Sequence, residues 1–228
     1  MDFRKVGDHS WALKIDSKGM KVDVTFDEAQ HGSAMMPATW DGEKVVWSST
    51  IGTAEVNGTI TFPSGETVQV NKWVGEEERM AGLFKLAPGH RGYEYAQSGN
   101  PDGSADQLFA FPNLDGTWTG HMAHTTKAGV VTTCTEPSVQ LSDWSHYINL
   151  DYPRTVAASC GGPTPLSHTW TVTEEHMLPL GLTNFGVNPV GLGDATGLGT
   201  TTMSDGHSDV AGSVATIQHL RNNPLYGH

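Results

Sequence analysis

Alternation of apolar and polar residues runs through most of this 228-residue chain and constrains its fold more than any other feature. Segments 21–26 (KVDVTF) and 67–70 (TVQV) alternate strictly, as expected for strands with one face toward a core. Sustained helical periodicity is missing from the sequence, although segments 26–36 and 76–86 could each hold a short helix. The pattern therefore predicts an all-β protein.

Turn-forming residues separate the alternating segments at short intervals. They are Ser17-Lys18-Gly19, Asp41-Gly42, Pro63-Ser64-Gly65, Asp102-Gly103, Asp115-Gly116 and Asp205-Gly206. An Asp-Gly pair between alternating runs favours a β-hairpin, because both residues tolerate positive φ. Asn57-Gly58 predicts either a tight turn or a bulge inside a longer strand. We expect an antiparallel meander of roughly a dozen strands.

Such a meander protects its edges by closing into a barrel or by stacking two sheets. We expect a barrel, with or without part of a second barrel or sheet. Residues 1–50 would be N-terminal strands, either the remnant of a first barrel or part of a single one, and residues 51–228 would form the barrel. Segment 179–209 is rich in glycine and poor in charge, which predicts a long loop or lid before a last strand at 210–220.

Charge and cysteine content narrow the partners and the compartment. The 25 acidic and 13 basic residues leave a net charge of −12, which disfavours nucleic acid and anionic membranes as partners. The chain has no apolar run that would serve as a signal peptide or a transmembrane helix. With Cys134 and Cys160 as its two cysteines, we expect a cytoplasmic protein with reduced thiols, Cys134 being buried. A homodimer remains open.

The order of several segments between residues 48 and 160 is typical of one family. They are SSTIGTAEVNGTITFPSGETVQVNKW (48–73), HRGYEYAQ (90–97), QLFAF (107–111), DGTWTGHMAHTTKAGVV (115–131) and VQLSDWSHYINLDYPRTVAAS (139–159). This order resembles the hydroxyneurosporene synthase (carotenoid 1,2-hydratase) and AttH-like family, which includes kievitone hydratase-like proteins and certain fungal Diels–Alderases. The resemblance implies lipocalin-like barrels and hydrophobic isoprenoid or polyketide substrates.

Two features depart from the family pattern. The chain is shorter than the family's chains, as if much of the first barrel were lacking. The signature Asp-His-x-Trp-Gly should follow the strand that ends at Trp73, but the sequence there is VGEEERMAG (74–82). An Asp-His-x-Trp occurs instead at 8–11, followed by Ala12. That tetrapeptide is either the displaced signature or a chance match.

Proton transfer to or from a hydrophobic substrate requires an acid or an imidazole in apolar surroundings, with aromatic walls to stabilise a cation. Asp8 and His9 suit this chemistry, but alternation along a strand pairs His9 with Trp11 and Asp8 with Ser10. A strand start that buries Trp11 is the alternative interpretation. Glu76 to Glu78 are secondary candidates, because they occupy the place of the signature.

Other candidates lie in the central segments. Tyr93 and Tyr95 would share one face of a strand and Glu94 the other, either near a ligand or in cross-strand aromatic packing. His121 and His124 are three residues apart and would face opposite sides, so we expect no metal site. The catalytic candidates are His9, Asp8, Tyr93, Glu94, His121 and His124. The substrate-binding candidates are Trp11, Trp73, Tyr95, Trp118 and Trp144.

These residues predict a lyase or isomerase of the hydratase, dehydratase or cyclase type, acting without metal or cofactor on an isoprenoid, polyketide or phenolic substrate. One alternative is a non-catalytic carrier of a lipophilic molecule. Another is a β-sandwich that binds sugars through exposed tryptophans. An acid with a perturbed pKa that faces the interior would favour the enzyme, and an all-apolar lining would favour the carrier.

Overall fold

The computed structural model describes residues 1–40, 43–83, 93–113, 115–147, 150–163, 165–172, 176–182, 190–203 and 214–221. Within these ranges the regular secondary structure consists of β-strands, and all pairs of strands are antiparallel. The prediction of an antiparallel all-β protein is confirmed. The two segments that could have held short helices belong to strands where they are described, apart from residues 32–33, which lie in neither a helix nor a strand. No helix in these ranges could cross a membrane.

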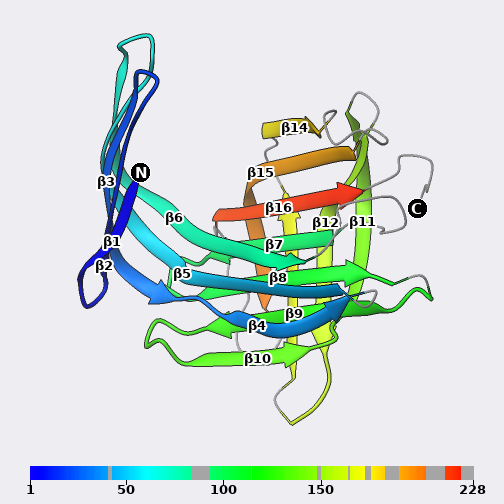
Figure 1. Cartoon of the computed structure of the whole chain (residues 1–228). Helices are drawn as coiled ribbons and strands as arrows, with labels where there is room; N and C mark the ends of the chain where they lie inside the picture. The colour runs from blue at the N-terminus through cyan, green and yellow to red at the C-terminus, as the bar shows by residue number, and fades with distance from the viewer. Residues whose placement is uncertain are drawn as a thin grey trace.

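The first sheet contains six strands among the described residues. They are β1 (Asp2–Gly7), β2 (Ser10–Ser17), β3 (Met20–His31), β4 (Ala34–Trp40), β5 (Glu43–Thr61) and β6 (Thr67–Leu83). The order is β1-β2-β3-β5-β4, and β6 pairs with the other edge of β5. In Figure 1 the β5–β6 hairpin rises beside the β2–β3 hairpin, while the rest of β5 and β6 runs across the molecule.

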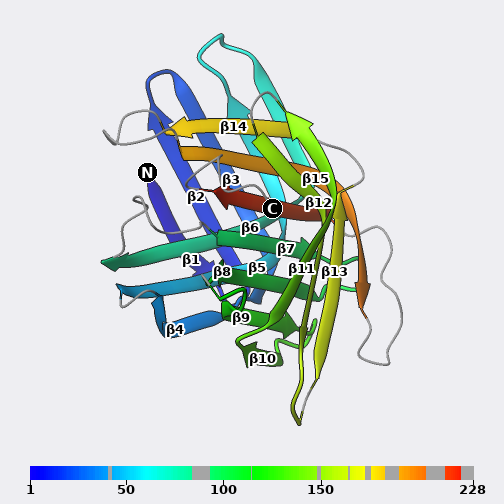
Figure 2. The same cartoon turned by 90° about the vertical axis from the view of Figure 1, so that its right-hand side faces the viewer.

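The second sheet contains ten strands among the described residues. They are β7 (Tyr93–Gly99), β8 (Ala105–Pro112), β9 (Trp118–Thr125), β10 (Val131–Thr135), β11 (Ser138–Tyr147), β12 (Leu150–Cys160), β13 (Leu166–Val172), β14 (His176–Leu182), β15 (Val190–Met203) and β16 (Val214–Arg221). The order is β10-β9-β8-β7-β16-β15-β13-β12-β11, with β14 beside β15. Figures 1 and 2 show β11 to β13 crossing the direction of β7 to β10.

The second sheet is strongly curved but does not close through hydrogen-bonded strands. Its pairing path ends at β10 and β11, and no ladder joins these ends among the described residues. The expected closed barrel is therefore an open, curved sheet that faces the first sheet. Residue 50 lies inside β5, and the change from the first sheet to the second falls between β6 and β7.

The prediction of a long loop at 179–209 is wrong where this segment is described. β14 and β15 occupy much of it, and β15 pairs with β14 and β13 along one edge and with β16 along the other. Glycine-rich sequence supplies few side chains for an alternating pattern, so the strand signal is weak although the backbone can still form ladders. Residues 183–189 and 204–209 lie outside the described ranges.

Asn57-Gly58 forms a bulge inside the continuous strand β5. Gly58 has φ +140°, and the pairing of β5 with β6 shifts register between Val56 and Gly58. A Cβ on Gly58 would clash with the Asp23 carbonyl oxygen and lie 2.8 Å from the Val24 Cα. The second of the two sequence interpretations, the bulge, is therefore the one observed.

We expect Gly58→Ala to lower the free energy of unfolding by about 2 kcal/mol or more, because the added methyl group meets backbone atoms that cannot move aside. Urea denaturation followed by circular dichroism measures the effect. Gly65→Ala is the matched control: Gly65 also has positive φ (+88°), but a Cβ there meets no atom within 4 Å. If both variants lost the same unfolding free energy, the contact of the Gly58 position with the β3 backbone would not be the cause.

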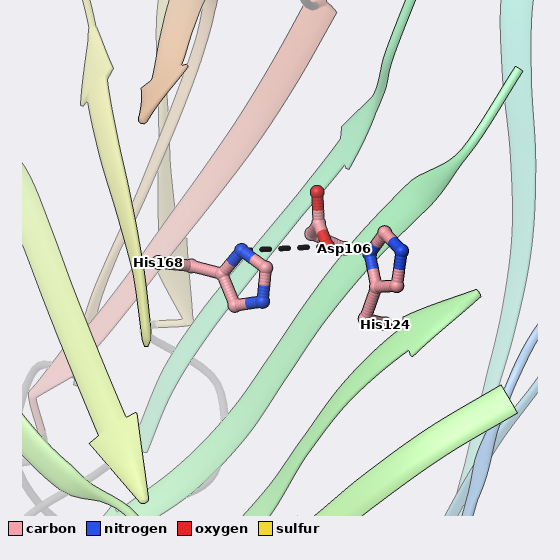
Figure 3. A group of neighbouring side chains, drawn as sticks. All are labelled: Asp106, His124 and His168. Carbon is pink, nitrogen blue, oxygen red and sulfur yellow. Dashed lines mark hydrogen bonds and ion pairs between the residues drawn. The ribbon is translucent and has the colours of Figure 1, made fainter. Parts of the chain in front are cut away.

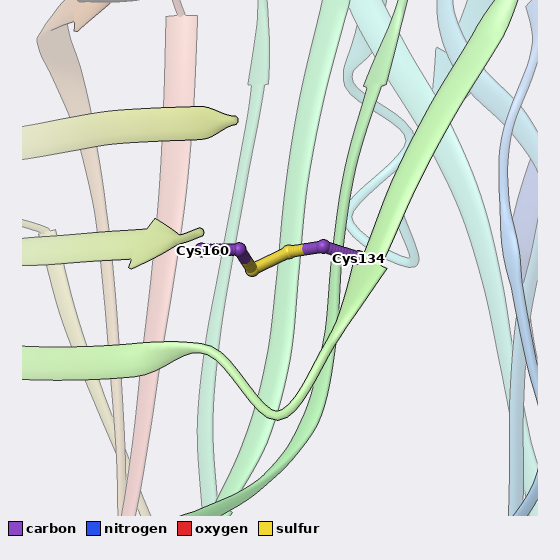
Figure 4. The surroundings of a disulfide bond; sticks show 2 residues. All are labelled: Cys134 and Cys160. Atoms are coloured by element: carbon purple, nitrogen blue, oxygen red, sulfur yellow. A yellow bond between two sulfur atoms is a disulfide. The ribbon is translucent and has the colours of Figure 1, made fainter. Parts of the chain in front are cut away.

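The two cysteines form a disulfide, so the expectation of reduced thiols is wrong (Figure 4). Cys134 lies on β10 and Cys160 at the end of β12, with Cα atoms 6.3 Å apart and a sequence separation of 26. Spacing alone does not reveal such a pairing, because the curvature of the second sheet brings β12 back to β10. The bond links the strand at one end of the pairing path to the strand next to the other end.

Candidate functional site

β7 and β8 are buried on both faces, since the first sheet covers one face and the curved second sheet encloses the other. The face that the curved second sheet encloses carries the core of that sheet, which includes Leu108, Met122, Val156 and Trp170. The opposite face of β8 carries Gln107, in line with strand alternation. Polar residues on these two strands must therefore find partners inside the protein.

Aromatic rings fill the space between the two sheets. Trp47 on β5 stacks on Phe109 of β8, with ring centroids 5.6 Å apart and planes inclined by 16°. Tyr93 and Tyr95 on β7 and Phe111 on β8 pack around Phe109 at 5.4, 6.2 and 4.9 Å. We call these five residues the inter-sheet cluster. Trp47, Tyr95 and Phe111 are fully buried in it.

A chain of polar side chains runs beside the inter-sheet cluster. The Ser33 hydroxyl donates to Gln107 Oε1 at 2.8 Å, and Gln107 Nε2 donates to Gln97 Oε1 at 3.0 Å. The Tyr95 hydroxyl reaches Gln97 Oε1 and, at 3.3 Å, Glu76 Oε2. The chain thus connects the interior to carboxyl groups on β6.

The carboxyl groups of β6 meet the edge of the inter-sheet cluster. Trp47 Nε1 donates to Glu78 Oε2 at 3.0 Å. Glu78 is an exposed residue at this edge, and the partial burial of its carboxyl group raises its pKa, while the hydrogen bond from Trp47 offsets part of that rise. Burial, followed by the charges of Glu76 and Glu78, raises the pKa of Tyr95 well above its usual value, so the phenol keeps its proton. This site combines two carboxyl groups, a phenol and an indole.

His121 on β9 lies against the same cluster. Its ring centroid is 6.3 Å from that of Trp47, and the residue is 4% exposed. Its Nε2 atom has no hydrogen-bond partner among the described residues. Burial lowers the pKa of His121 to about 4, so the imidazole is neutral at pH 7.

This pKa predicts a loss of stability in mild acid. The unfolded chain binds a proton at His121 near pH 6.5, but the folded protein binds it only near pH 4. Stability contributed by the neutral ring is fully present above about pH 6.5 and is lost as the pH falls toward 4. We expect His121→Phe to lose less unfolding free energy than the wild type between these pH values, measured by urea denaturation. Parallel pH profiles would contradict the assignment.

A second polar group lies on the opposite face of β8 and β9. His124 Nδ1 lies 2.6 Å and His168 Nδ1 3.4 Å from Asp106 Oδ1. Figure 3 shows the carboxylate between the two imidazole rings. Asp106 and His168 are fully buried, and the side chain of His124 is 14% exposed. One ligand atom from each of the three residues lies within 4.8 Å of the others.

The first two catalytic candidates lie elsewhere. Asp8 and His9 form the exposed turn between β1 and β2, and His9 Nδ1 lies 3.3 Å from the Ala29 carbonyl oxygen. Trp11 is half-buried, stacks on Phe3 at 5.1 Å and packs against the core of the first sheet. The structure therefore matches the alternative in which this segment packs Trp11, although a turn rather than a strand holds Asp8 and His9.

The remaining candidates are divided among three places. Tyr93 and Tyr95 belong to the inter-sheet cluster, whereas Glu94 is buried at the next position of β7. Trp118 is half-buried beside the core of the second sheet. Trp73 and Trp144 are 49% and 39% exposed and lie on different sheets. The structure does not bring these two tryptophans to the inter-sheet cluster.

Several residues of both groups are not among the candidates that the sequence indicates. They are Trp47, Gln97, Gln107 and Phe109 in the first group, and Asp106 and His168 in the second. Alternation in QLFAF does place Gln107 and Phe109 on one face, and in SHTW it places His168 beside Trp170. Which strand faces which across the two sheets has no local signal, so the meeting of Trp47 with Phe109 could not be predicted.

The fold and the site define an all-β protein in which two antiparallel sheets pack over an aromatic cluster with buried polar groups. No family model and no curated protein matches the sequence. An AttH-like protein from Nitrosomonas europaea matches the structure with a TM-score of 0.63 at 15% identity, over 95% of this chain and 66% of that one. Kievitone hydratase from Nectria haematococca matches with a TM-score of 0.59 at 12% identity, over 95% and 66%.

A further solved structure, CghA with Sch210972, matches with a TM-score of 0.62 at 12% identity, over 94% of this chain and 66% of that one. The chain thus spans about two thirds of the length of these proteins. At identities this low, the structural matches show a shared fold and nothing more. The AttH-like and kievitone hydratase folds are those that the sequence resemblance implied, so the fold expectation is confirmed.

Proposed function

We propose that this chain is a cofactor-independent lyase or isomerase that transfers a proton to a hydrophobic substrate at the inter-sheet cluster. The observation that carries the proposal is the contact of the Glu78 carboxyl group with the Trp47 indole beside the Tyr95 phenol. A carboxyl group with a raised pKa beside aromatic rings is suited to general acid catalysis. A hydratase of similar fold is consistent with this reaction class.

The residues take distinct roles in the proposed addition of water. The proton on Glu78 adds to one carbon of a substrate double bond, and the π electrons form the new C–H bond. The cationic carbon that remains lies at the edge of the inter-sheet cluster where Trp47 meets Glu78, and it accepts a water oxygen. That water returns a proton to the Glu78 carboxylate, which restores the acid. The Tyr95 hydroxyl, held protonated, would donate a hydrogen bond to a substrate oxygen.

Glu78→Gln tests this role. The amide keeps the shape and can still accept the Trp47 hydrogen bond, but it cannot donate a proton to carbon. With a substrate found by screening terpenoid, polyketide-like and phenolic compounds, we expect kcat to fall about 100-fold or more with little change in KM. Glu66→Gln, in the exposed turn between β5 and β6, should retain wild-type kcat.

The screen also separates the alternatives. Each compound is titrated while tryptophan fluorescence is followed, and turnover is then measured for any that quenches it saturably. Saturable quenching without turnover would favour the non-catalytic carrier. Quenching by soluble sugars and by no hydrophobic compound would overturn the proposal and favour sugar binding through the exposed tryptophans.

A further inference from the structure

Asp106, His124 and His168 come from three strands, β8, β9 and β13, that the curvature of the second sheet brings together. They lie on the face of β8 and β9 opposite the inter-sheet cluster, so this group is separate from the site of the proposed reaction. Two imidazoles and one carboxylate form a donor set that binds divalent first-row transition metals.

The surroundings of Asp106 favour a cation or strong hydrogen-bond donors beside its carboxylate. The carboxylate is fully buried and shares its face of the sheet with the apolar core that contains Leu108, Met122 and Trp170. An ionised carboxylate in such surroundings is costly unless a cation or strong hydrogen bonds compensate it. Two imidazole nitrogens converge on the same oxygen, Oδ1, and that geometry suits a cation shared among the three groups.

Neighbouring residues hold the carboxylate in this orientation. Asn100 Nδ2 donates to Asp106 Oδ2 at 2.7 Å and contacts Ser104 Oγ at 2.8 Å. The second carboxylate oxygen is therefore already satisfied, and Oδ1 is left facing the imidazoles. Supporting hydrogen bonds of this kind orient the ligands of metal sites.

The two histidines are also arranged in a fixed way. Their rings stack with centroids 6.0 Å apart and planes inclined by 18°, and His168 packs against Trp170 at 5.6 Å. His124 is the one member of the group that reaches solvent, with 14% of its side chain exposed. An ion would enter, and a water ligand would complete its coordination, from the side of His124.

We propose that Asp106, His124 and His168 bind one divalent transition-metal ion, with Zn²⁺ as the simplest occupant. This proposal departs from the sequence-based expectation of no metal, which rests on the spacing of His121 and His124. The alternative for the same geometry is a metal-free ion pair, in which Asp106 and His124 are joined by a shared proton.

Titration of the 228-residue protein with Co²⁺ and with Zn²⁺, after treatment with a chelator, tests the proposal. We expect one ion per chain by calorimetry, a visible Co²⁺ absorption band that Zn²⁺ displaces, and a rise in Tm on addition of Zn²⁺. His124→Gln and Asp106→Asn should weaken binding by at least about 100-fold and abolish the Tm shift. His9→Gln removes an exposed histidine from the first sheet and should leave binding unchanged.

His124→Gln keeps the test informative even if substitutions at the fully buried positions prevent folding, because His124 lies at the edge of the core. Absence of stoichiometric binding to the folded wild type would overturn the proposal. So would wild-type affinity in His124→Gln. A stability profile that depends on pH and on His124, without any response to either metal, would assign the geometry to the proton-sharing pair instead.

Discussion

Trp47→Ala is expected to lower the free energy of unfolding by about 3–5 kcal/mol, a typical loss for a fully buried tryptophan. Trp47 is 0% exposed and contacts Phe109, Tyr95 and His121 across the boundary between the two sheets. Its removal leaves a cavity where the sheets meet and also leaves Glu78 without its indole donor. Guanidinium denaturation, followed by circular dichroism, measures the loss.

Two further variants test whether the stability loss in Trp47→Ala comes from its buried ring contacts. Trp73→Ala removes the same side chain from a position that is 49% exposed, and we expect a loss below about 1 kcal/mol. Trp47→Phe restores part of the ring packing without the N–H group, and its stability should lie between those of the wild type and Trp47→Ala. A loss at Trp47 as small as that at Trp73 would show that the inter-sheet cluster does not hold the sheets together.

Reduction of the Cys134–Cys160 disulfide is expected to cost about 3 kcal/mol of unfolding free energy. The bond closes a loop with a sequence separation of 26, and a cross-link of that length removes corresponding entropy from the unfolded chain. It also packs against the core of the second sheet, between strands that no ladder joins among the described residues. The disulfide therefore cross-links the two end regions of the open, curved sheet.

The measurement compares urea denaturation of the oxidised protein with that of the protein in excess dithiothreitol. The Cys134→Ser/Cys160→Ser double variant should match the reduced wild type and show no response to the reductant. Equal midpoints for oxidised and reduced wild type would contradict a stabilising role. Because disulfides are rare in cytosolic proteins, the bond also removes the cysteine-based reason for expecting a cytoplasmic protein.

Much of the fold follows from local features. Alternation with period two predicted the strands, and the turns at Gly19, Gly65, Gly103 and Gly116 adopt the positive φ that their sequences favour. Alternation also predicted that His121 and His124 face opposite sides of one strand. These properties depend on near neighbours in the chain, which is why a sequence contains them.

Other features required contacts between distant segments. The position of Glu76 and Glu78 in the chain makes them secondary candidates, but their contacts with Tyr95 and Trp47 arise from the packing of β6 and β5 against β7. Asp8 and His9 are the first catalytic candidates that the sequence indicates, yet they lie in an exposed turn. The neighbouring Trp11 packs against the core of the first sheet.

The sequence by itself determined the strands, most of the turns and the face on which each central side chain lies. The tertiary structure decided which faces meet, and so placed Trp47 beside Glu78 and His168 beside Asp106. It also paired the cysteines and left the second sheet open between β10 and β11. The physical reason is that alternation is set within a few residues, whereas sheet curvature and sheet packing sum small twists and side-chain contacts over the whole chain.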